Sequence, residues 1–453
     1  MRAYIVIDLG FGDCGKGLLT DFLARKRGAG LVVRYNGGAQ AGHNVVTPGG
    51  RQHTFSQFGS GTFVPGVKTF LSRYMVFHPT ALLVEGDALA TKGVPDAFQR
   101  LRVSQDALVI TPFHQAANRL REIGRADGRH GSCGVGVGEA VEDARAHPAG
   151  SLRAGDLLDP PRLRRKLEAV RQRERAQLLA TFGSRLHEGA FAHEWQVFER
   201  ADVTENWIAA VRRIAALGLV APDDVLRTWL RHSETAVFEG AQGVLLDAEA
   251  GFHPYTTWSD CTARNAMAIL KEMAPGYSAF QIGVMRCYVM RHGPGPLPTE
   301  TGELAPLVTE HNRTNPWQGA VRYAWFDALL ARYALSLAGK LDSLLITHLD
   351  VLPRLTAWKF CNRYHERFDF EEGTVERAPS GEVTDLHPRR DPALESRQRF
   401  SRALTAVEPA LEACRADETA VIRKIEELTG CTVGMVSRGP SAADVQLLPG
   451  LMQ

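Results

Sequence analysis

The feature that most constrains the fold is the stretch of residues 3–23, which joins an apolar run to a glycine-rich segment and then to an amphipathic pattern. The apolar run covers residues 3–9, and after position 17 the apolar residues recur at helical spacing. The stretch therefore predicts a buried strand, a tight loop and a helix. In that arrangement backbone N–H groups converge at the N-terminus of the helix, where they can bind an anion.

The loop nearly matches the phosphate-binding pattern G-x-x-x-x-G-K-[ST], because Gly10, Gly15 and Lys16 have the required spacing. The next residue is Gly17, so the hydroxyl that usually holds Mg²⁺ is missing, and Asp13 is the nearest candidate for that role. An ordinary glycine-rich turn between a strand and a helix is the alternative interpretation.

The composition is that of a soluble globular protein, with 44% hydrophobic and 23% charged residues among 453 and a formal net charge of +2. Such a small charge predicts neither nucleic-acid nor membrane binding, and the basic run at residues 162–175 is interpreted as a solvated helix face. Seven cysteines without a C-x-x-C pair argue against a disulfide framework and a zinc site. We expect a cytoplasmic protein without signal peptide or membrane span.

Beyond the first helix, short apolar runs alternate with helical patterns, which predicts an α/β fold with a central, mostly parallel sheet flanked by helices. A charged helical segment at about 157–217 is expected to leave the sheet as an excursion. Residues 183–189 and 378–391 are predicted to be loops, and neither separates two complete cores. We therefore expect one domain over residues 1–453.

Three further positions follow predicted strands or lie in glycine-rich loops. His43 lies in such a loop after the strand 31–35, where glycines allow the backbone to approach a ligand, although a lone histidine is often structural. Gln242 comes just after the strand 235–240, at the strand end where open α/β sheets bind ligands. Asp350 ends the strand 344–350 and could accept two hydrogen bonds from guanine or, alternatively, cap a helix.

Six segments, in order along nearly the whole chain, resemble the adenylosuccinate synthetase family, which couples GTP to the joining of IMP and L-aspartate. They are G-D-C-G-K-G (12–17), R-Y-N-G-G-A-Q-A-G-H (34–43), F-E-G-A-Q-G-V-L-L-D (238–247), R-H-G-P-G-P-L-P-T-E (291–300), T-H-L-D-V-L (347–352) and I-E-E-L-T-G (425–430). The resemblance implies a GTP- and Mg²⁺-dependent ligase with an α/β fold, usually a homodimer.

The resemblance also implies the catalytic roles. Asp13 would take the lactam proton of a purine-like acceptor and contact Mg²⁺, and the resulting oxyanion would attack the γ-phosphorus of GTP. His43 would act as general acid toward the transferred phosphoryl group. Lys16 and the loop amides would hold the phosphates, the Gly42 carbonyl would be a second metal ligand, and Gln242 would recognise the lactam edge.

The remaining implied contacts are binding roles. The nucleotide would be held by Gly12, Gly15, Lys16, Gly17, Gly42, His348, Asp350, Ser437, Gly439 and Pro440. The acceptor and the amino-acid donor would be held by Asp13, Gln40, Ser132, Cys133, His147, Gln242, Leu246, Thr257, Arg313 and Arg322.

This chain departs from the family pattern mainly on the acceptor side. Gln40 replaces a phosphate-contacting asparagine, and Ser132 and Cys133 replace paired threonines that hold the 5′-phosphate, although a thiol is a weak donor. The arginine that the partner subunit lends to this phosphate aligns near Arg145 and His147, and the sequence does not decide between them.

The loop that binds aspartate differs most. The family's arginine cluster becomes N-R-T-N-P-W-Q-G-A-V-R-Y (312–323), in which Arg313 and Arg322 could compensate. These departures favour a paralogue with an altered acceptor and donor, and an ordinary adenylosuccinate synthetase is the alternative. A GTP-binding regulatory protein without ligase activity is a second alternative, against which Asp13 and His43 argue, since a protein that only binds GTP would not need them.

Overall fold

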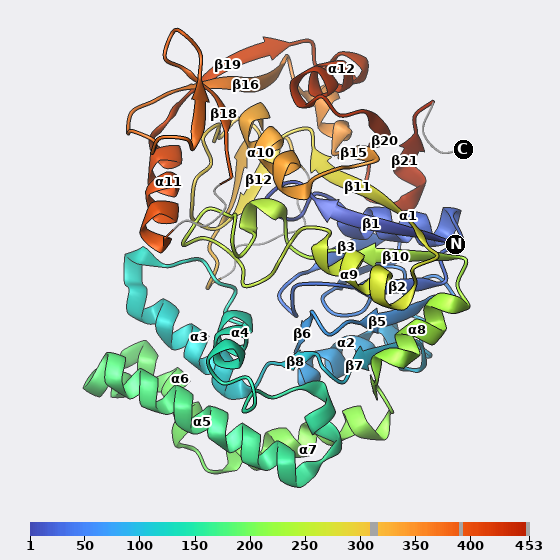
Figure 1. Ribbon diagram of the computed structural model, residues 1–453, viewed down its shortest axis with the longest axis vertical. Coiled ribbons are helices and arrows are strands. Elements are labelled where there is room, and N and C mark those ends of the chain that lie inside the picture. The colour runs from blue at the N-terminus through green and yellow to red at the C-terminus, as the bar shows by residue number, and fades with distance from the viewer. Residues whose placement is uncertain (309–315, 389–392, 450–453) are drawn as a thin grey trace.

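The computed structural model describes residues 1–308, 316–388 and 393–449, and in this part of the chain ten strands form one sheet (Figure 1). Adjacent strands are parallel, except that β21 at one edge is antiparallel to β20. In spatial order the strands are β21 (Val445–Leu447), β20 (Val433–Ser437), β15 (Ser343–Thr347), β11 (Ser278–Arg286), β1 (Arg2–Asp8), β10 (Thr235–Glu239), β2 (Leu31–Arg34), β5 (Lys68–Leu71), β7 (Leu101–Ser104) and β9 (Val220–Ala221). This sheet confirms the predicted fold class.

Strand β1 lies between β10 and β11 and is buried on both faces, which explains its nearly continuous apolar sequence. Tyr4 and Val6 pack on one face with apolar residues of α1 (Lys16–Lys26). Ala3, Ile5 and Ile7 pack on the other face with residues of α8 (Asp223–Arg231), α9 (Arg264–Met273) and α10 (Ala328–Ala338). The sheet therefore separates two layers of helices, because side chains alternate between the faces of a strand.

The predicted helical excursion is confirmed as α5 (Pro160–Phe182), α6 (Gly189–Glu199) and α7 (Asp202–Ala216). These helices form the lower layer in Figure 1, and α3 (Pro112–Arg125) packs against α5 and α6. The next helix, α4 (Val137–Ala146), contacts α3 and follows a glycine-rich loop. A 3₁₀ turn at Gly183–His187 replaces part of the loop that we predicted there.

A smaller sheet on the C-terminal side was not predicted. It contains β14 (Phe326–Asp327), β16 (Trp358–His365), β17 (Val375–Arg377), β18 (Val383–Leu386) and β19 (Glu408–Cys414) (Figure 1). The helix α11 (Leu394–Ala406) lies between β18 and β19 in the chain. The prediction of a loop at 378–391 was therefore wrong at β18, which pairs with β17 and packs against α10.

The other strands form three short pairs, the hairpin of β3 and β4, the parallel pair of β6 and β8 and the antiparallel pair of β12 and β13, and two more helices connect elements of the fold. They are β3 (His43–Val46), β4 (Gln52–Phe55), β6 (Val76–Phe77), β8 (Leu108–Val109), β12 (Val289–His292), β13 (Val321–Ala324), α2 (Pro79–Thr91) and α12 (Glu418–Thr429). Among the helices of the described residues, none is long and apolar enough to span a lipid bilayer.

The parallel strands end along one edge of the large sheet, where the loops after β1, β2, β10, β11, β15 and β20 emerge. Ligands of open α/β sheets bind at this edge. The predicted site residues at positions 13, 43, 242, 350 and 437 all lie in or next to these loops.

Candidate active site

The loop after β1 is organised from within by the carboxylate of Asp8. Its oxygens accept hydrogen bonds from the backbone N–H groups of Gly10, Gly12 and Cys14 at 2.9–3.3 Å, and from Lys16 Nζ at 2.7 Å. Burial raises the pKa of Asp8, but the Lys16 ammonium more than offsets this and lowers it below its usual range. An ammonium has three donors, so Lys16 can still contact a second anion.

The N-terminus of α1 faces this loop and carries no acidic side chain or side-chain cap that would satisfy its first N–H groups. Gly15 begins the helix in a left-handed conformation (φ 110°). A Cβ atom on Gly17 would lie 3.0 Å from the carbonyl oxygen of Asn44 and 3.1 Å from Cβ of His43. Glycine at position 17 therefore lets the strand that carries His43 lie directly on the helix N-terminus.

His43 is held by Glu239, which is itself held by Ser60. Its Nδ1 lies 2.6 Å from Oε1 of Glu239, at the end of β10, and Glu239 in turn accepts hydrogen bonds from the backbone N–H and the hydroxyl of Ser60. The Nε2 atom of His43 is buried and has no hydrogen-bond partner among the described residues. One imidazole nitrogen is thus fixed by protein, and the other is left for a ligand.

The charges of this pair follow from its surroundings. Burial, together with the nearby Arg34, lowers the pKa of His43 to about 4 against the opposing effect of Glu239. Burial raises the pKa of Glu239, but His43 and Arg34 outweigh it and bring it to about 2. At neutral pH the Glu239 carboxylate is therefore ionised and accepts the Nδ1 proton of a neutral imidazole. A proton gained at Nε2 would make His43 a donor toward an anion.

Gln242 lies opposite this pair in a left-handed conformation (φ 55°). Both atoms of its amide group are buried without a hydrogen-bond partner in the described part of the chain. A Cβ atom on Gly37 would approach Oε1 of Gln242 to 2.8 Å, so the glycine-rich loop after β2 makes room for this amide. Nε2 of Gln242 can donate and Oε1 can accept a hydrogen bond, so together they are suited to bind an amide-like group of a ligand, which has one acceptor beside one donor.

Of the side chains described so far, Lys16, His43 and Gln242 line one cavity of about 790 Å³. The cavity brings together eleven of the predicted site residues, namely Gly12, Asp13, Lys16, Gln40, Gly42, His43, Ser132, Cys133, Gln242, Leu246 and Thr257. Asp13 and His43 therefore face the same space rather than opposite sides of the sheet. Its walls also include residues of α3, α4 and α11.

The Asp13 carboxylate and the Gly42 carbonyl, both on this cavity, are oxygen ligands of the type that Mg²⁺ prefers. Among the described residues there is no cluster of three or more His, Cys, Asp or Glu side chains that could hold a metal. This donor set fits Mg²⁺, which is usually held by one or two carboxylates and by substrate phosphates.

The predicted guanine-binding residues lie beside this cavity rather than on its wall. His348 and Asp350 follow β15, and Ser437, Gly439 and Pro440 end or follow the neighbouring strand β20. Nδ1 of His348 lies 2.9 Å from Oγ1 of Thr347, whose hydroxyl donates to the Cys14 carbonyl at 2.8 Å. The end of β15 is thereby joined to the loop after β1. The role of these residues in guanine binding stays a prediction.

Two predicted binding residues, His147 and Arg322, are placed differently from the prediction. His147 is exposed and does not line the cavity, whereas Arg145 does and lies over the ring of Trp258 at 5.2 Å. Arg322 donates to the Glu300 carboxylate and to the carbonyl oxygens of Gly293 and Gly295, so its N–H groups are engaged by the chain itself. Arg313 lies outside the described residues.

Sequence reasoning did not assign roles to Glu239, Ser60 and Asp8. Glu239 and Asp8 are the last residues of the buried strands β10 and β1, and a carboxylate at such a position is a recognisable signal. The part played by Ser60 depends on a contact between segments 179 residues apart, which no local pattern indicates.

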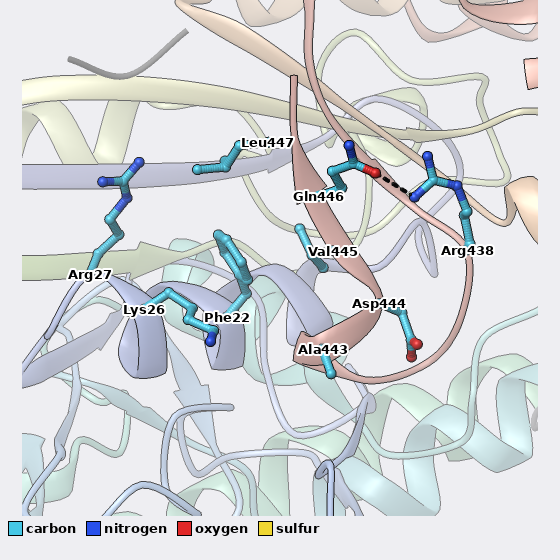
Figure 2. Close-up of a pocket in the computed structure, with 9 residues that line it drawn as sticks. All are labelled: Phe22, Lys26, Arg27, Arg438, Ala443, Asp444, Val445, Gln446 and Leu447. Atoms are coloured by element: carbon cyan, nitrogen blue, oxygen red, sulfur yellow. Dashed lines mark hydrogen bonds between the residues drawn. The ribbon is translucent and has the colours of Figure 1, made fainter. Parts of the chain in front are cut away.

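A second hollow, of about 710 Å³, lies at the other end of α1 and shares no residue with the cavity. Figure 2 shows Phe22, Lys26 and Arg27 on one side of it and Arg438 and Gln446 on the other, joined by a hydrogen bond of 2.8 Å. Lys26 is ten residues from Lys16, or about 15 Å along the helix, so the Lys26 end of this hollow is remote from the cavity at the N-terminus of α1.

The chain is similar in sequence to known proteins along nearly its whole length. The family model described as adenylosuccinate synthetase matches residues 5–446. The chain is 32% identical over 453 residues to the adenylosuccinate synthetase of Neisseria gonorrhoeae (strain ATCC 700825 / FA 1090), covering 98% of each chain. It is also 32% identical over 449 residues to that of Azotobacter vinelandii, again covering 98% of each.

Two solved structures share the fold. The fully ligated adenylosuccinate synthetase of Plasmodium falciparum has a TM-score of 0.75 and 18% identity, covering 99% of this chain and 100% of its own. The succinoaminodeoxyadenylate synthetase of cyanophage S-2L, bound to dGMP and dATP, has a TM-score of 0.59 and 18% identity, covering 99% and 95%.

Proposed function

The chain belongs to the adenylosuccinate synthetase family of GTP-dependent C–N ligases, and from this premise we propose that it uses GTP to activate the lactam oxygen of a purine-like acceptor for displacement by an amino-acid amine. The acceptor is IMP or an analogue, and the donor is aspartate or another amino acid. The observation that carries the proposal is that Asp13, His43 and Gln242 line one cavity beside the N-terminus of α1.

A lactam oxygen is a poor leaving group, so the reaction needs two steps. In the first, Asp13 takes the proton from the lactam nitrogen, the oxyanion attacks the γ-phosphorus, and the bond to the β-phosphate oxygen breaks to release GDP. In the second, the amine attacks the ring carbon and loses a proton, and inorganic phosphate leaves with the electrons of the C–O bond and accepts that proton. The buried amide of Gln242 orients the acceptor edge in both steps.

Transfer of the phosphoryl group depends on stabilisation of its negative charge. His43, once protonated at Nε2 and backed by Glu239, donates to the phosphoryl oxygens, while Lys16 and the first N–H groups of α1 hold the phosphates. Mg²⁺ bound to Asp13 and Gly42 would neutralise charge on the phosphates.

A paralogue with altered substrates is favoured by the engagement of Arg322, which leaves the donor's carboxylates without that partner. An ordinary adenylosuccinate synthetase is favoured by the 98% coverage of the relatives. With IMP and aspartate, a turnover of about 1 s⁻¹ or more would be in the normal enzyme range and would identify the ordinary enzyme.

The proposal extends to the whole chain as one domain over residues 1–453, acting as a cytoplasmic homodimer. The largest apolar cluster contains residues from Ala3 to Val436, so segments from both ends of the chain share one core. All seven cysteines are free thiols, which suits a reducing compartment.

The test is GDP release with GTP, Mg²⁺, a lactam acceptor and an amino acid, with each component omitted in turn. Asp13→Asn should lower turnover at least about 100-fold, as expected for loss of a general base. The variant should still bind GTP. Asp106→Asn, an exposed aspartate outside the cavity, is the matched control. Turnover that survived Asp13→Asn, or that needed no acceptor, would contradict the proposed function.

A further inference from the structure

One end of the cavity is formed by the N-terminus of α4 and the glycine-rich loop before it. Gly136 precedes the helix in a left-handed conformation (φ 91°), and Glu139 is the third residue of the helix. Helix N-termini attract anions, and here the chain places its own carboxylate in the first turn. Ser132, Cys133 and Glu139 all line this end of the cavity.

The Glu139 carboxylate is buried, with 6% of the residue exposed, and only partly satisfied. Its Oε1 accepts a hydrogen bond from Nδ2 of Asn118 at 3.2 Å and lies 3.6 Å from Nη1 of Arg121. Its Oε2 has no hydrogen-bond partner among the described residues. A buried carboxylate oxygen left unpaired is costly, so this atom marks a place for a donor supplied by a ligand.

Arg121 does not turn this end of the cavity into a cationic site. Its Nη2 donates to Glu174 and to Gln177, each at 2.9 Å, so one guanidinium faces the two buried carboxylates of Glu139 and Glu174. Its Nη1 is buried and has no hydrogen-bond partner in the described chain. The nearby Arg125 is paired with Glu122 at 2.5 Å. Among these five charged side chains the three carboxylates of Glu122, Glu139 and Glu174 outnumber the two guanidinium groups.

Two neutral side chains at this end, Ser132 and Cys133, offer little to a phosphate. The Ser132 hydroxyl donates to Oδ1 of Asn118 at 3.2 Å and accepts from its Nδ2 at 3.0 Å. Cys133 provides only a thiol, a weak donor. Arg145 also lines the cavity, but it is exposed and lies six residues beyond Glu139, or about 9 Å along the helix.

A ligand group at this end must donate to Oε2 of Glu139 and accept from Nη1 of Arg121. A hydroxyl group does both, whereas a phosphate dianion can only accept and is repelled by the carboxylate. We propose that the acceptor presents a neutral hydroxyl group, not a phosphate, to Glu139, so that the substrate class is a purine nucleoside rather than a nucleotide. This inference rests on the proposed function, whose lactam acceptor it specifies.

The test compares binding of inosine and IMP to the full chain with GDP and Mg²⁺ by calorimetry, since both carry the same lactam. Inosine should bind at least about tenfold more tightly than IMP, because the carboxylate repels the phosphate. Glu139→Gln removes the charge but keeps the shape, and it should reduce this preference at least tenfold by improving IMP binding. Glu234→Gln, an exposed residue outside the cavity, is the control and should leave the preference unchanged.

Tighter binding of IMP than of inosine to the unmodified protein would overturn the inference and leave the proposed function standing. If IMP binds more tightly and the Arg145→Ala variant loses IMP binding, the phosphate of IMP lies at Arg145. Binding of neither compound would overturn both the inference and the proposed lactam acceptor. An unchanged preference in a folded Glu139→Gln variant would also contradict the inference.

Discussion

Two buried residues, His43 and Glu239, carry most of the charge chemistry of the site. The 2.6 Å contact of Nδ1 with the carboxylate fixes the ring, so Nε2 has a defined direction before any ligand arrives. Glu239 does not itself line the cavity and acts through His43 as a positioning residue. Its carboxylate also supplies the negative charge that would stabilise an imidazolium during phosphoryl transfer.

The variant Glu239→Gln should lower kcat about 100-fold, at the lower limit of general acid–base effects, and leave the KM for GTP nearly unchanged. A glutamine side chain keeps the size of the glutamate and can still orient the ring, but it cannot stabilise a protonated imidazole. Steady-state kinetics check the result, and circular dichroism confirms that the variant is folded. A raised KM with unchanged kcat would show that Glu239 serves only nucleotide binding.

The sequence predicted the positions of some site residues and missed the contacts of others. Asp13, Lys16, His43 and Gln242 stood out because each lies in a glycine-rich loop or just after a buried strand, and the structure places all four on one cavity. The engagement of Arg322 by Glu300 could not be predicted, since the pairing depends on how the loop after β12 folds back on β13.

Among the elements, the contact between α1 and the hairpin of β3 and β4 decides the position of His43. The contact is possible because Gly17 has no side chain, and the nearest obstacles to a Cβ atom are a backbone oxygen and the His43 side chain itself. A backbone atom cannot rotate away, so a methyl group there must displace the hairpin.

Gly17→Ala should therefore reduce kcat at least about tenfold while the protein stays folded, because small misplacements of catalytic groups are costly. Gly49→Ala, in the turn of the same hairpin, has nothing within 4 Å of the added atom and is the matched control. Kinetics and thermal melting of both variants test the prediction. Equal activity of the two variants would contradict this account of residue 17.

A second element-scale prediction concerns Asp327, the N-cap of α10. Its Oδ1 accepts from the backbone N–H of Leu330 at 3.1 Å, and both oxygens lie 2.7 Å from the Tyr364 hydroxyl. Burial raises the pKa of Asp327 to about 6, which exceeds its ordinary value of 3.8. The folded state therefore holds this proton more tightly than the unfolded state.

The stability contributed by protonated Asp327 is present below about pH 4 and is lost as the pH rises through 6. From pH 4 to 7 this loss is on the order of 3 kcal/mol. Asp327→Asn keeps a capping side chain without a charge, so its stability relative to the unmodified protein should improve over this range. Urea unfolding at several pH values measures it, with Asp417→Asn, the N-cap of α12, as control. Parallel pH profiles for Asp327→Asn and the unmodified protein would refute the prediction.

The elements themselves were predictable to different degrees. β1, β10 and β15 are buried strands of a parallel sheet, and their continuous apolar runs are a strong signal. In the smaller sheet, β17 and β19 consist mostly of exposed or half-buried residues, so their sequences carry no clear apolar pattern. Pairing with other strands, rather than local preference, makes them strands, since β17 pairs with the next strand β18 and β19 with the more distant β16.

For the whole molecule, the large sheet gathers segments from residue 2 to residue 447 along one edge. This placement explains how Asp13, His43 and Gln242 line one cavity although they are up to about 230 residues apart, as expected for a ligand site at the strand ends. The order of the strands is set by long-range pairing, which the sequence did not reveal, although the fold class followed from the alternation of strands and helices.

The central claim is that the lactam oxygen of the acceptor is phosphorylated by GTP before an amine displaces it. The direct measurement uses inosine and IMP labelled with ¹⁸O at the lactam position, together with GTP, Mg²⁺ and an amino-acid donor. Mass spectrometry of the released phosphate should show one ¹⁸O atom per phosphate from whichever acceptor turns over. Phosphate that contains no label while GTP is consumed would mean that GTP is simply hydrolysed, and it would contradict the account.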